Sequence, residues 1–238
     1  MGFMNKGASV FSGFPTEAFT FFRGLARNNR REWFQPRKEI FEGKVRAPMI
    51  ELVETINSGL RNFAPAHVNE PGKAIYRIYR DTRFSHDKTP YKTHIAAIFP
   101  RRGFAKHSSA GFYFGVSVEG IEIAGGIYMP GPSELLAVRG WLSENHERFR
   151  KAARGPRKLM GELHGEALQR VPKGFRADHA AADLLRMKQW LYFTTLDAKL
   201  AHSPGLGSEL LKRFQAMLPV VEILNAPLKP ARGPGDFV

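Results

Sequence analysis

The sequence predicts an α+β fold in a single domain, with a central, mainly antiparallel β-sheet and helices from the N- and C-terminal segments packed on it. Apolar residues recur at helical spacing near both ends of the chain, whereas the middle is rich in the β-branched and aromatic residues of strands. No repeat, coiled-coil pattern or long linker divides the 238 residues. We therefore expect a flexible N-terminus (residues 1–13), one α+β domain (14–225) and an irregular Pro/Gly-rich tail (226–238).

Residues 14–27 predict the first helix, with Pro15 suited to its first turn. Its apolar stripe consists of Ala18, Phe19, Phe22, Leu25 and Ala26. Asn28 and Asn29 end this helix, because asparagine tolerates the left-handed cap conformation and can also cap the next helix.

A second helical pattern follows Trp33 and Phe34. Its stripe consists of Ile40, Phe41, Val45, Met49, Leu52, Val53, Ile56 and Leu60. Pro48 lies inside the pattern, and we expect it to kink or split the helix because proline lacks the amide hydrogen that helices need.

Four strands are expected next, over residues 74–80, 91–99, 111–118 and 121–128. The second strand alternates, with Tyr91, Thr93, Ile95, Ala97 and Phe99 on one face. Glu119-Gly120 fits a two-residue hairpin turn between the last two strands. The first two strands are then joined by a connection rich in charged residues.

The C-terminal part mixes helices and a strand. Ser133 can cap a helix whose stripe is Leu135, Val138, Leu142 and Phe149, and a basic, glycine-broken stretch follows over 151–165. Then come a turn at 172–175, a short helix through Leu184-Leu185 and a strand over 189–195. Ser208 starts a last helix, which Pro219 is expected to interrupt.

Composition restricts the function classes. The 36 Lys and Arg against 22 Asp and Glu give a net charge of +14, which favours nucleic acid, anionic membranes or phosphorylated metabolites, or reflects only a basic proteome. The absence of cysteine excludes disulfides, thiolate nucleophiles and cysteine-bound zinc. No apolar run is long enough for a transmembrane helix, and no secretory signal pattern is present, so we expect a cytoplasmic protein with no membrane partner.

The densest chemistry lies in residues 77–93. The wider segment 71–110 holds nine Lys and Arg against two Asp. Arginine binds carboxylate and phosphate oxygens in pairs, so the segment predicts a site for a small anionic ligand. The residues proposed to bind the anion are Arg77, Arg80, Arg83, Lys88 and Tyr91.

Two other interpretations of this segment stay open. Asp81 and Asp87 can pair with the arginines, so that the motif is an internal clasp fastening a loop to the sheet. Alternatively, the basic region binds nucleic acid, with aromatic residues such as Phe84 stacking on bases.

The same residues carry a family resemblance. Arg77, Arg80, Asp81, Arg83, Phe84, Lys88, Pro90 and Tyr91 match in full the pattern R-x-x-R-D-x-R-F-x-x-x-K-x-P-Y. The chain thus resembles the mostly bacterial family called domain of unknown function 2461, from about Phe14 to Leu224. Asn28-Asn29 with Trp33-Phe34 is similar to the family's N-terminal signature, and residues 172–175 with Lys188 to its C-terminal one. The resemblance implies no reaction, since the family has none assigned.

Further candidate residues are weaker. Asn28, Asn29 and Trp33 could line a pocket, although caps and core anchors explain them as well. Lys173 and Lys188 could extend the cationic site. His86, beside Asp87, is the best candidate for a general acid or base. The histidines show no metal-binding spacing, and no phosphate-binding or dinucleotide-binding glycine motif occurs, so neither a metal nor a cofactor is expected.

Overall fold

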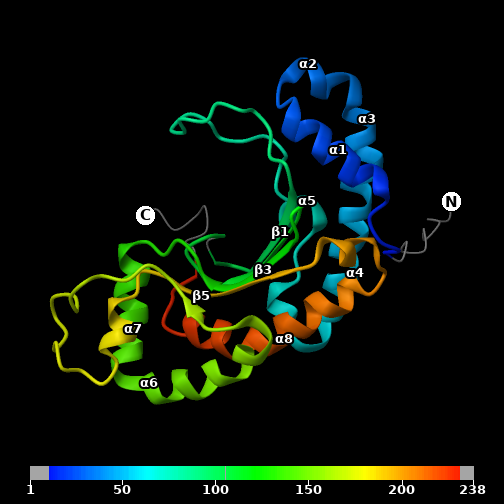
Figure 1. The fold of residues 1–238 in the computed structure, drawn as a ribbon. Coiled ribbons are helices and arrows are strands. Elements are labelled where there is room, and N and C mark those ends of the chain that lie inside the picture. The colour runs from blue at the N-terminus through cyan, green and yellow to red at the C-terminus, as the bar shows by residue number, and fades with distance from the viewer. Residues whose placement is uncertain (1–10, 105, 231–238) are drawn as a thin grey trace, which may run out of the picture.

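An antiparallel sheet of five strands organises the structure, in the order β1-β2-β3-β5-β4 (Figure 1). The computed structural model describes residues 11–104 and 106–230. The strands are β1 (Ile95–Pro100), β2 (Gly111–Val116), β3 (Ile121–Ile127), β4 (Leu163–His164) and β5 (Trp190–Leu196). The predicted α+β fold is confirmed, and so are three of the four central strands and the strand near the C-terminus.

The two faces of the sheet differ because side chains alternate along each strand. Across four neighbouring strands, one row is Ala97, Phe114, Ile123 and Thr194. The next row, on the opposite face, is Ile98, Tyr113, Ala124 and Phe193. The first row faces the helices, whereas Phe193 in the second row is 42% exposed. The sheet therefore has one covered face and one largely open face.

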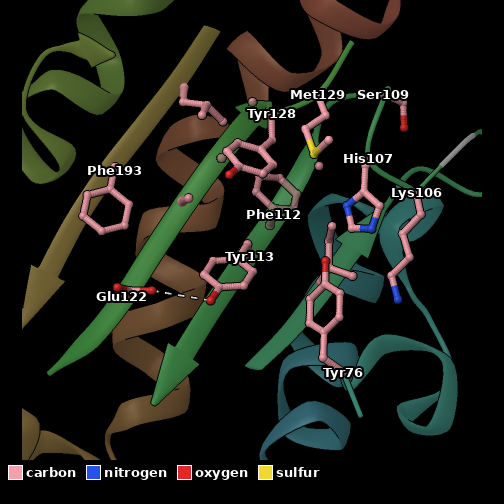
Figure 2. Close-up of a pocket in the computed structure, with 16 residues that line it drawn as sticks. Tyr76, Lys106, His107, Ser109, Phe112, Tyr113, Glu122, Tyr128, Met129 and Phe193 are labelled. Atoms are coloured by element: carbon pink, nitrogen blue, oxygen red, sulfur yellow. Dashed lines mark hydrogen bonds between the residues drawn. The ribbon is translucent and has the colours of Figure 1, made fainter. Parts of the chain in front are cut away.

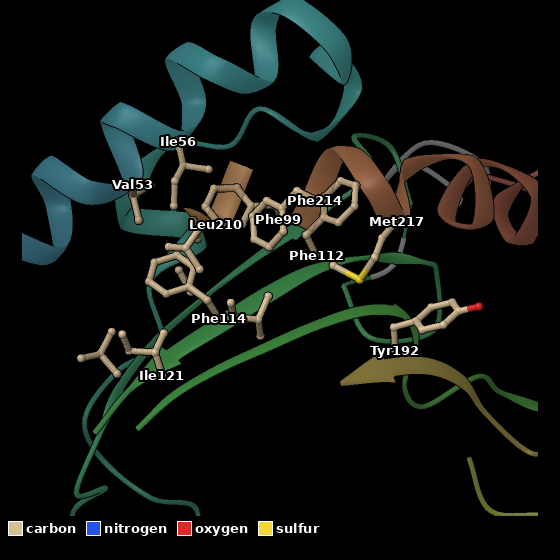
Figure 3. Close-up of a cluster of buried hydrophobic side chains, with 14 of the residues drawn as sticks. Val53, Ile56, Phe99, Phe112, Phe114, Ile121, Tyr192, Leu210, Phe214 and Met217 are labelled. Carbon is tan, nitrogen blue, oxygen red and sulfur yellow. The ribbon is translucent and has the colours of Figure 1, made fainter. Parts of the chain in front are cut away.

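The covered face packs against three long helices, α4 (Ala47–Phe63), α6 (Pro132–Met160) and α8 (Leu206–Asn225) (Figure 1). Figure 3 shows α4 and α8 presenting Ile56 and Phe214 toward the strands. The ring of Phe214 stacks on Phe112 at 4.8 Å between centroids and lies 5.8 Å from Phe99. This aromatic layer joins the helices to the sheet.

The N-terminal helices lie beside one end of the sheet. They comprise α1 (Thr16–Arg27), α2 (Arg31–Phe34), the 3₁₀ turn η1 (Gln35–Arg37), α3 (Lys38–Ile40) and the π-helical segment η2 (Phe41–Arg46), which leads into α4. Two short elements, η3 (Pro65–His67) and α5 (Pro71–Ala74), follow α4. Pro48 cannot donate to the preceding turn, and the helix widens into η2 just before it, so the predicted disturbance is confirmed.

Some predicted positions in these helices are wrong. Ile40 is 43% exposed, and Ala26 is also exposed, because the short segments α2 to α3 rotate the chain away from one continuous stripe. Asn28 caps α1 without the left-handed conformation: its φ is −137°, and its side-chain amide donates to the Gly24 carbonyl at 3.1 Å. The next helix begins at Arg31, and its cap residue is Arg30, which makes no side-chain cap hydrogen bond.

The C-terminal half also departs from the prediction. Helix α6 continues to Met160 with a kink at Asn145, so the stretch 151–160 is helical rather than broken, and burial of Phe149 and Pro156 holds it. Pro132 occupies its first turn and Gly131 its cap position, so Ser133 is not the cap. Helix α8 likewise continues through Pro219, because Val220, Val221 and Leu224, which follow the proline, are buried.

Two further elements complete the chain, α7 (Ala182–Arg186) and η4 (Ala198–His202), and α7 confirms the predicted short helix. The hairpin turn lies one residue earlier than predicted, with Val118 and Glu119 at its centre, since Ser117 N–H donates to the Gly120 carbonyl at 3.0 Å. Within the described residues, none of the helices has the length and apolarity required to cross a membrane.

The domain starts earlier than predicted. Phe11 is 1% exposed and packs on Phe14, so residues 11–13 belong to the folded part. The rest of the predicted flexible N-terminus, residues 1–10, lies outside the described residues, as does 231–238 of the predicted tail. Residues 226–230 form a turn and irregular chain, with Leu228 buried.

Candidate functional site

Residues 75–97, here called the arm, project from the edge of the sheet as a long hairpin (Figure 1). Two isolated bridges hold its base, Ile75 with Ala97 and Tyr79 with Tyr91. The return side contains two more residues between these bridges than the outgoing side, so the pairing changes register at Thr93-His94. For this reason the predicted strand 74–80 does not form a regular strand.

At the base of the arm, Tyr91 is fixed from two directions. The Asn29 side chain donates to the Tyr91 carbonyl at 2.8 Å and accepts from its N–H at 3.0 Å. The Tyr91 ring stacks on Phe34 of α2 with 4.3 Å between centroids and is 2% exposed. Tyr91, one of the residues proposed to bind the anion, therefore anchors the arm, with its ring covered rather than open to solvent.

At the tip, residues 80–89, the cationic side chains contact groups of the tip itself. Arg80 donates to Asp87 and to Thr89, and Arg83 forms a two-pronged ion pair with Asp81 at 2.8 and 3.0 Å. Lys88 Nζ donates to the Thr82 carbonyl at 2.9 Å. The arginines thus pair with the aspartates as the clasp interpretation expects, but these contacts are internal to the tip and do not fasten it to the sheet.

The electrostatics of the two tip aspartates follow from these pairs. The Arg83 guanidinium and backbone N–H lower the pKa of Asp81 to about 2. The Thr89 N–H and the Arg80 guanidinium lower the pKa of Asp87 to about 2. Both carboxylates thus stay ionised, and they neutralise two of the arginines over the whole range of physiological pH.

The remaining candidates lie apart from one another. Phe84 is 93% exposed at the tip, and His86 is exposed there with no hydrogen bond or ion pair to another described residue. Trp33 packs on Phe21 with Arg37 over its ring at 4.5 Å, which is a structural role.

Lys173 is exposed on the loop 165–181, and Lys188 pairs with Glu166 at 3.2 Å. That loop and the arm lie at separate ends of the molecule in Figure 1. The structure therefore does not bring Lys173 to the motif. Among residues 11–104 and 106–230, no group of three or more His, Cys, Asp or Glu side chains is placed to hold a metal ion.

A second cationic group lies at the base of the arm, around Tyr76. The ammonium groups of Lys92 and Lys106 lie 4.8 and 4.5 Å from the centre of the Tyr76 ring. Burial lowers the pKa of Lys92, and the charges of Arg77 and Lys106 lower it further. None of these three cations, here called the base trio (Arg77, Lys92 and Lys106), forms an ion pair with a carboxylate in the described part of the chain.

Next to the base trio, the open face of the sheet contains a cavity of about 360 Å³, here called the sheet hollow (Figure 2). Its lining includes Tyr76, Tyr113, Tyr128, Met129, Phe193 and the small residues Gly111, Ala124 and Gly126. Gly111 and Gly126 are required there by the close approach of the neighbouring strands. Gly126 has no alternative, since its φ is +129° and a Cβ would meet the Trp190 carbonyl oxygen at 1.9 Å.

The ionisation states of the sheet hollow follow from burial. Burial raises the pKa of Tyr76 to about 12 and, together with Glu122, raises the pKa of Tyr113 above its ordinary value. Burial and the charge of Lys106 lower the pKa of His107. The two phenols therefore remain protonated hydrogen-bond donors, and the one carboxylate of the lining, Glu122, accepts from the Tyr113 hydroxyl at 3.4 Å.

Sequence reasoning missed the sheet hollow and Lys106 as part of a site. The available signal was the presence of Gly111, Gly125 and Gly126 in strands, because glycine inside a strand often marks the close approach of a ligand or another backbone. Which face of the sheet those glycines occupy depends on strand register, which the sequence does not reveal.

Comparisons with known proteins give one match. No curated protein and no solved structure matches the chain. A family model described as "Conserved hypothetical protein (DUF2461)" matches residues 17–222, which is most of the chain. The match includes the arm and the strands that line the sheet hollow. The chain therefore belongs to the family called domain of unknown function 2461.

Proposed function

We propose that this protein binds a small anionic ligand at the base of the arm, with Arg77, Lys92 and Lys106 as its charged contacts. The observation that carries the proposal is the base trio itself. Lys92 is partly buried beside two other cations, and no described carboxylate pairs with any of them. Placing Lys92 and Lys106 together with no described carboxylate paired to either costs free energy, and a bound phosphate, sulfate or carboxylate group would offset that cost.

The motif then has two parts with different roles. Arg80, Arg83 and Lys88 maintain the conformation of the tip through their contacts with Asp87, Asp81 and Thr82. Arg77 and Lys92, near the two ends of the motif, face the ligand together with Lys106. This division places the anion site at the base of the arm, with Lys106 added from outside the motif, and assigns the Arg–Asp pairs to the tip. The setting we propose is the cytoplasm, which the absence of cysteine favours.

Phosphate binding tests the proposal. We expect inorganic phosphate to raise the melting temperature of the wild type, since a ligand at 100 times its Kd adds about 2.7 kcal/mol to the stability. Lys92→Ala and Lys106→Ala should each weaken phosphate binding at least about tenfold, because a hydrogen bond to a charged group contributes about 1.5–3 kcal/mol. Differential scanning calorimetry measures the melting temperature, and isothermal titration calorimetry measures the affinities.

Two control variants make this test specific. Lys151→Ala removes an exposed lysine from α6, on the covered side of the sheet, and should leave the affinity unchanged. Arg83→Ala removes a tip cation that already has a carboxylate partner, and should change the affinity less than twofold. If phosphate does not bind, or if Lys151→Ala weakens it as much as Lys92→Ala does, the proposal is wrong.

Nucleic acid remains the alternative ligand, favoured by the charge of +14. The salt dependence separates the two. For single strands, the logarithm of the affinity falls with the logarithm of salt concentration with a slope of about −0.7 per contacted phosphate. Tight binding of an oligothymidylate with a slope steeper than about −3 would support the nucleic-acid function instead of a small ligand.

A further inference from the structure

The sheet hollow and the base trio share one residue, Lys106, and both border on Tyr76. The Tyr76 ring lines the hollow and at the same time lies under the ammonium groups of Lys92 and Lys106. A group bound at the trio is therefore adjacent to the hollow. What the hollow would hold can be argued from its lining.

The lining is apolar and aromatic, and much of it is exposed. Tyr128, Met129 and Phe193 are 57%, 61% and 42% exposed, and all three line the hollow. Large apolar side chains that are exposed together around one cavity are typical of a ligand-binding site, because soluble proteins rarely leave such clusters in contact with water. Aromatic walls favour a flat ring, which stacks on or packs edge-to-face against them.

The charges give the ligand a direction. Figure 2 shows Lys106 and His107 on one side of the hollow and Glu122 on the other. The Glu122 carboxylate repels an anion, so the negative group of a ligand belongs at the lysine end. Its uncharged part then extends across the floor of Ala124 and Gly126 toward Tyr113 and Phe193.

We infer that the ligand is an aromatic anion: a planar ring that occupies the sheet hollow, joined to a negatively charged group that binds the base trio. The inference rests on the proposed anion site and names its ligand class. A cavity of about 360 Å³ is within the range of small-molecule sites and accommodates one ring system with its anionic group.

Two phosphate monoesters, methyl phosphate and phenyl phosphate, distinguish the contribution of the ring to binding from that of the anionic group. They carry the same anionic group, and only the second carries a ring. We expect the wild type to bind phenyl phosphate at least tenfold more tightly than methyl phosphate, as measured by isothermal titration calorimetry. Lys106→Ala should weaken the binding of both esters by a similar factor.

Two variants of the hollow locate the ring. Ala124→Leu fills the floor and Phe193→Ala removes a wall, and either should reduce the preference for phenyl phosphate below threefold without weakening methyl phosphate. Leu136→Ala, which removes an exposed apolar side chain from α6, should leave the preference unchanged. Melting curves verify that each variant is folded. Because one variant fills the hollow and the other removes a wall, the same loss of preference in both would locate the ring in the hollow.

The outcomes distinguish the two proposals. If methyl phosphate binds and phenyl phosphate binds no more tightly, the aromatic ligand class is wrong and the anion site stands. If the preference survives in both hollow variants, the ring binds elsewhere and the inference is overturned. If methyl phosphate does not bind to the wild type, or binding of both esters is unaffected by Lys106→Ala, the proposed anion site itself is wrong.

Discussion

Single asparagine side chains connect distant parts of this chain by pairing with a backbone N–H and a backbone carbonyl at once. Asn29 does so with Tyr91, and Asn225 with Ala110, where both bonds are 2.9 Å long. Asn225 is 1% exposed and Ala110 is fully buried. Each amide fixes the relative position of two segments that no ladder joins, and the bonds of Asn225 are buried, where losing them leaves polar groups without partners.

This geometry predicts the effect of Asn225→Ala. The substitution leaves the N–H and the carbonyl of Ala110 buried without partners, at about 1–3 kcal/mol for each group. We expect a loss of roughly 3 kcal/mol in the free energy of unfolding, measured by urea denaturation. Glu222→Gln, on the exposed face of the same helix, should change it by less than about 0.5 kcal/mol. A loss below about 1 kcal/mol in Asn225→Ala would show that the two bonds are not made in solution.

At the scale of the element, the arm is held by different forces at its two ends. Its base is fixed by a buried ring and by backbone pairing, whereas its tip is exposed and ordered by ion pairs. Exposed ion pairs contribute little to overall stability. The tip pairs therefore set the local conformation of the motif and do not hold the domain together.

The tip pairs predict the titration of their carboxylates. Because the folded pKa values of Asp81 and Asp87 are about 2, below the ordinary 3.8, the pairs are complete above pH 4 and are lost as the pH falls through 2. Carbon-detected NMR of the two carboxyl groups should show these midpoints. In Arg83→Gln, the midpoint of Asp81 should rise toward 3.8 while that of Asp87 stays low. Ordinary midpoints for both groups in the wild type would exclude the ion pairs.

At the scale of the whole molecule, one helical layer covers one face of the sheet and leaves the other face open. Phe214 of α8 is central to that contact, because its ring touches the rings of Phe99 and Phe112 on two strands. The open face is where the hollow and the base trio meet. The packing of α8 on the covered face thus helps to hold the strands whose open face carries the proposed site.

Phe214→Ala tests this contact. Removing a fully buried ring leaves a cavity and costs about 3–5 kcal/mol. We expect a decrease of this size in the free energy of unfolding by urea denaturation, with the fold retained in mild conditions. Leu136→Ala, at a residue 66% exposed, should change the stability by less than about 0.5 kcal/mol. Equal effects of the two substitutions would contradict the assignment of Phe214 to the core.

Local patterns predicted the elements well where a single physical rule controls them. Apolar spacing identified α1, α4 and α8, and alternation identified β1, because these periods follow from backbone geometry alone. The predictions failed at Pro219 and at 151–160, where helices continue despite proline and glycine. There, burial of neighbouring apolar side chains outweighs a local helix-breaking tendency, and burial is a property of the tertiary structure.

The sequence by itself determined the fold class, the family and the segment in which the charged residues concentrate. Only the tertiary structure decided how that charge is divided. It gave Arg80 and Arg83 carboxylate partners at the tip, buried Tyr91 under Asn29 and Phe34, and placed Lys92 beside Lys106 at an open cavity. The physical reason is that ion pairing and burial depend on distance in space, and a pattern of residues along the chain specifies only distance in sequence.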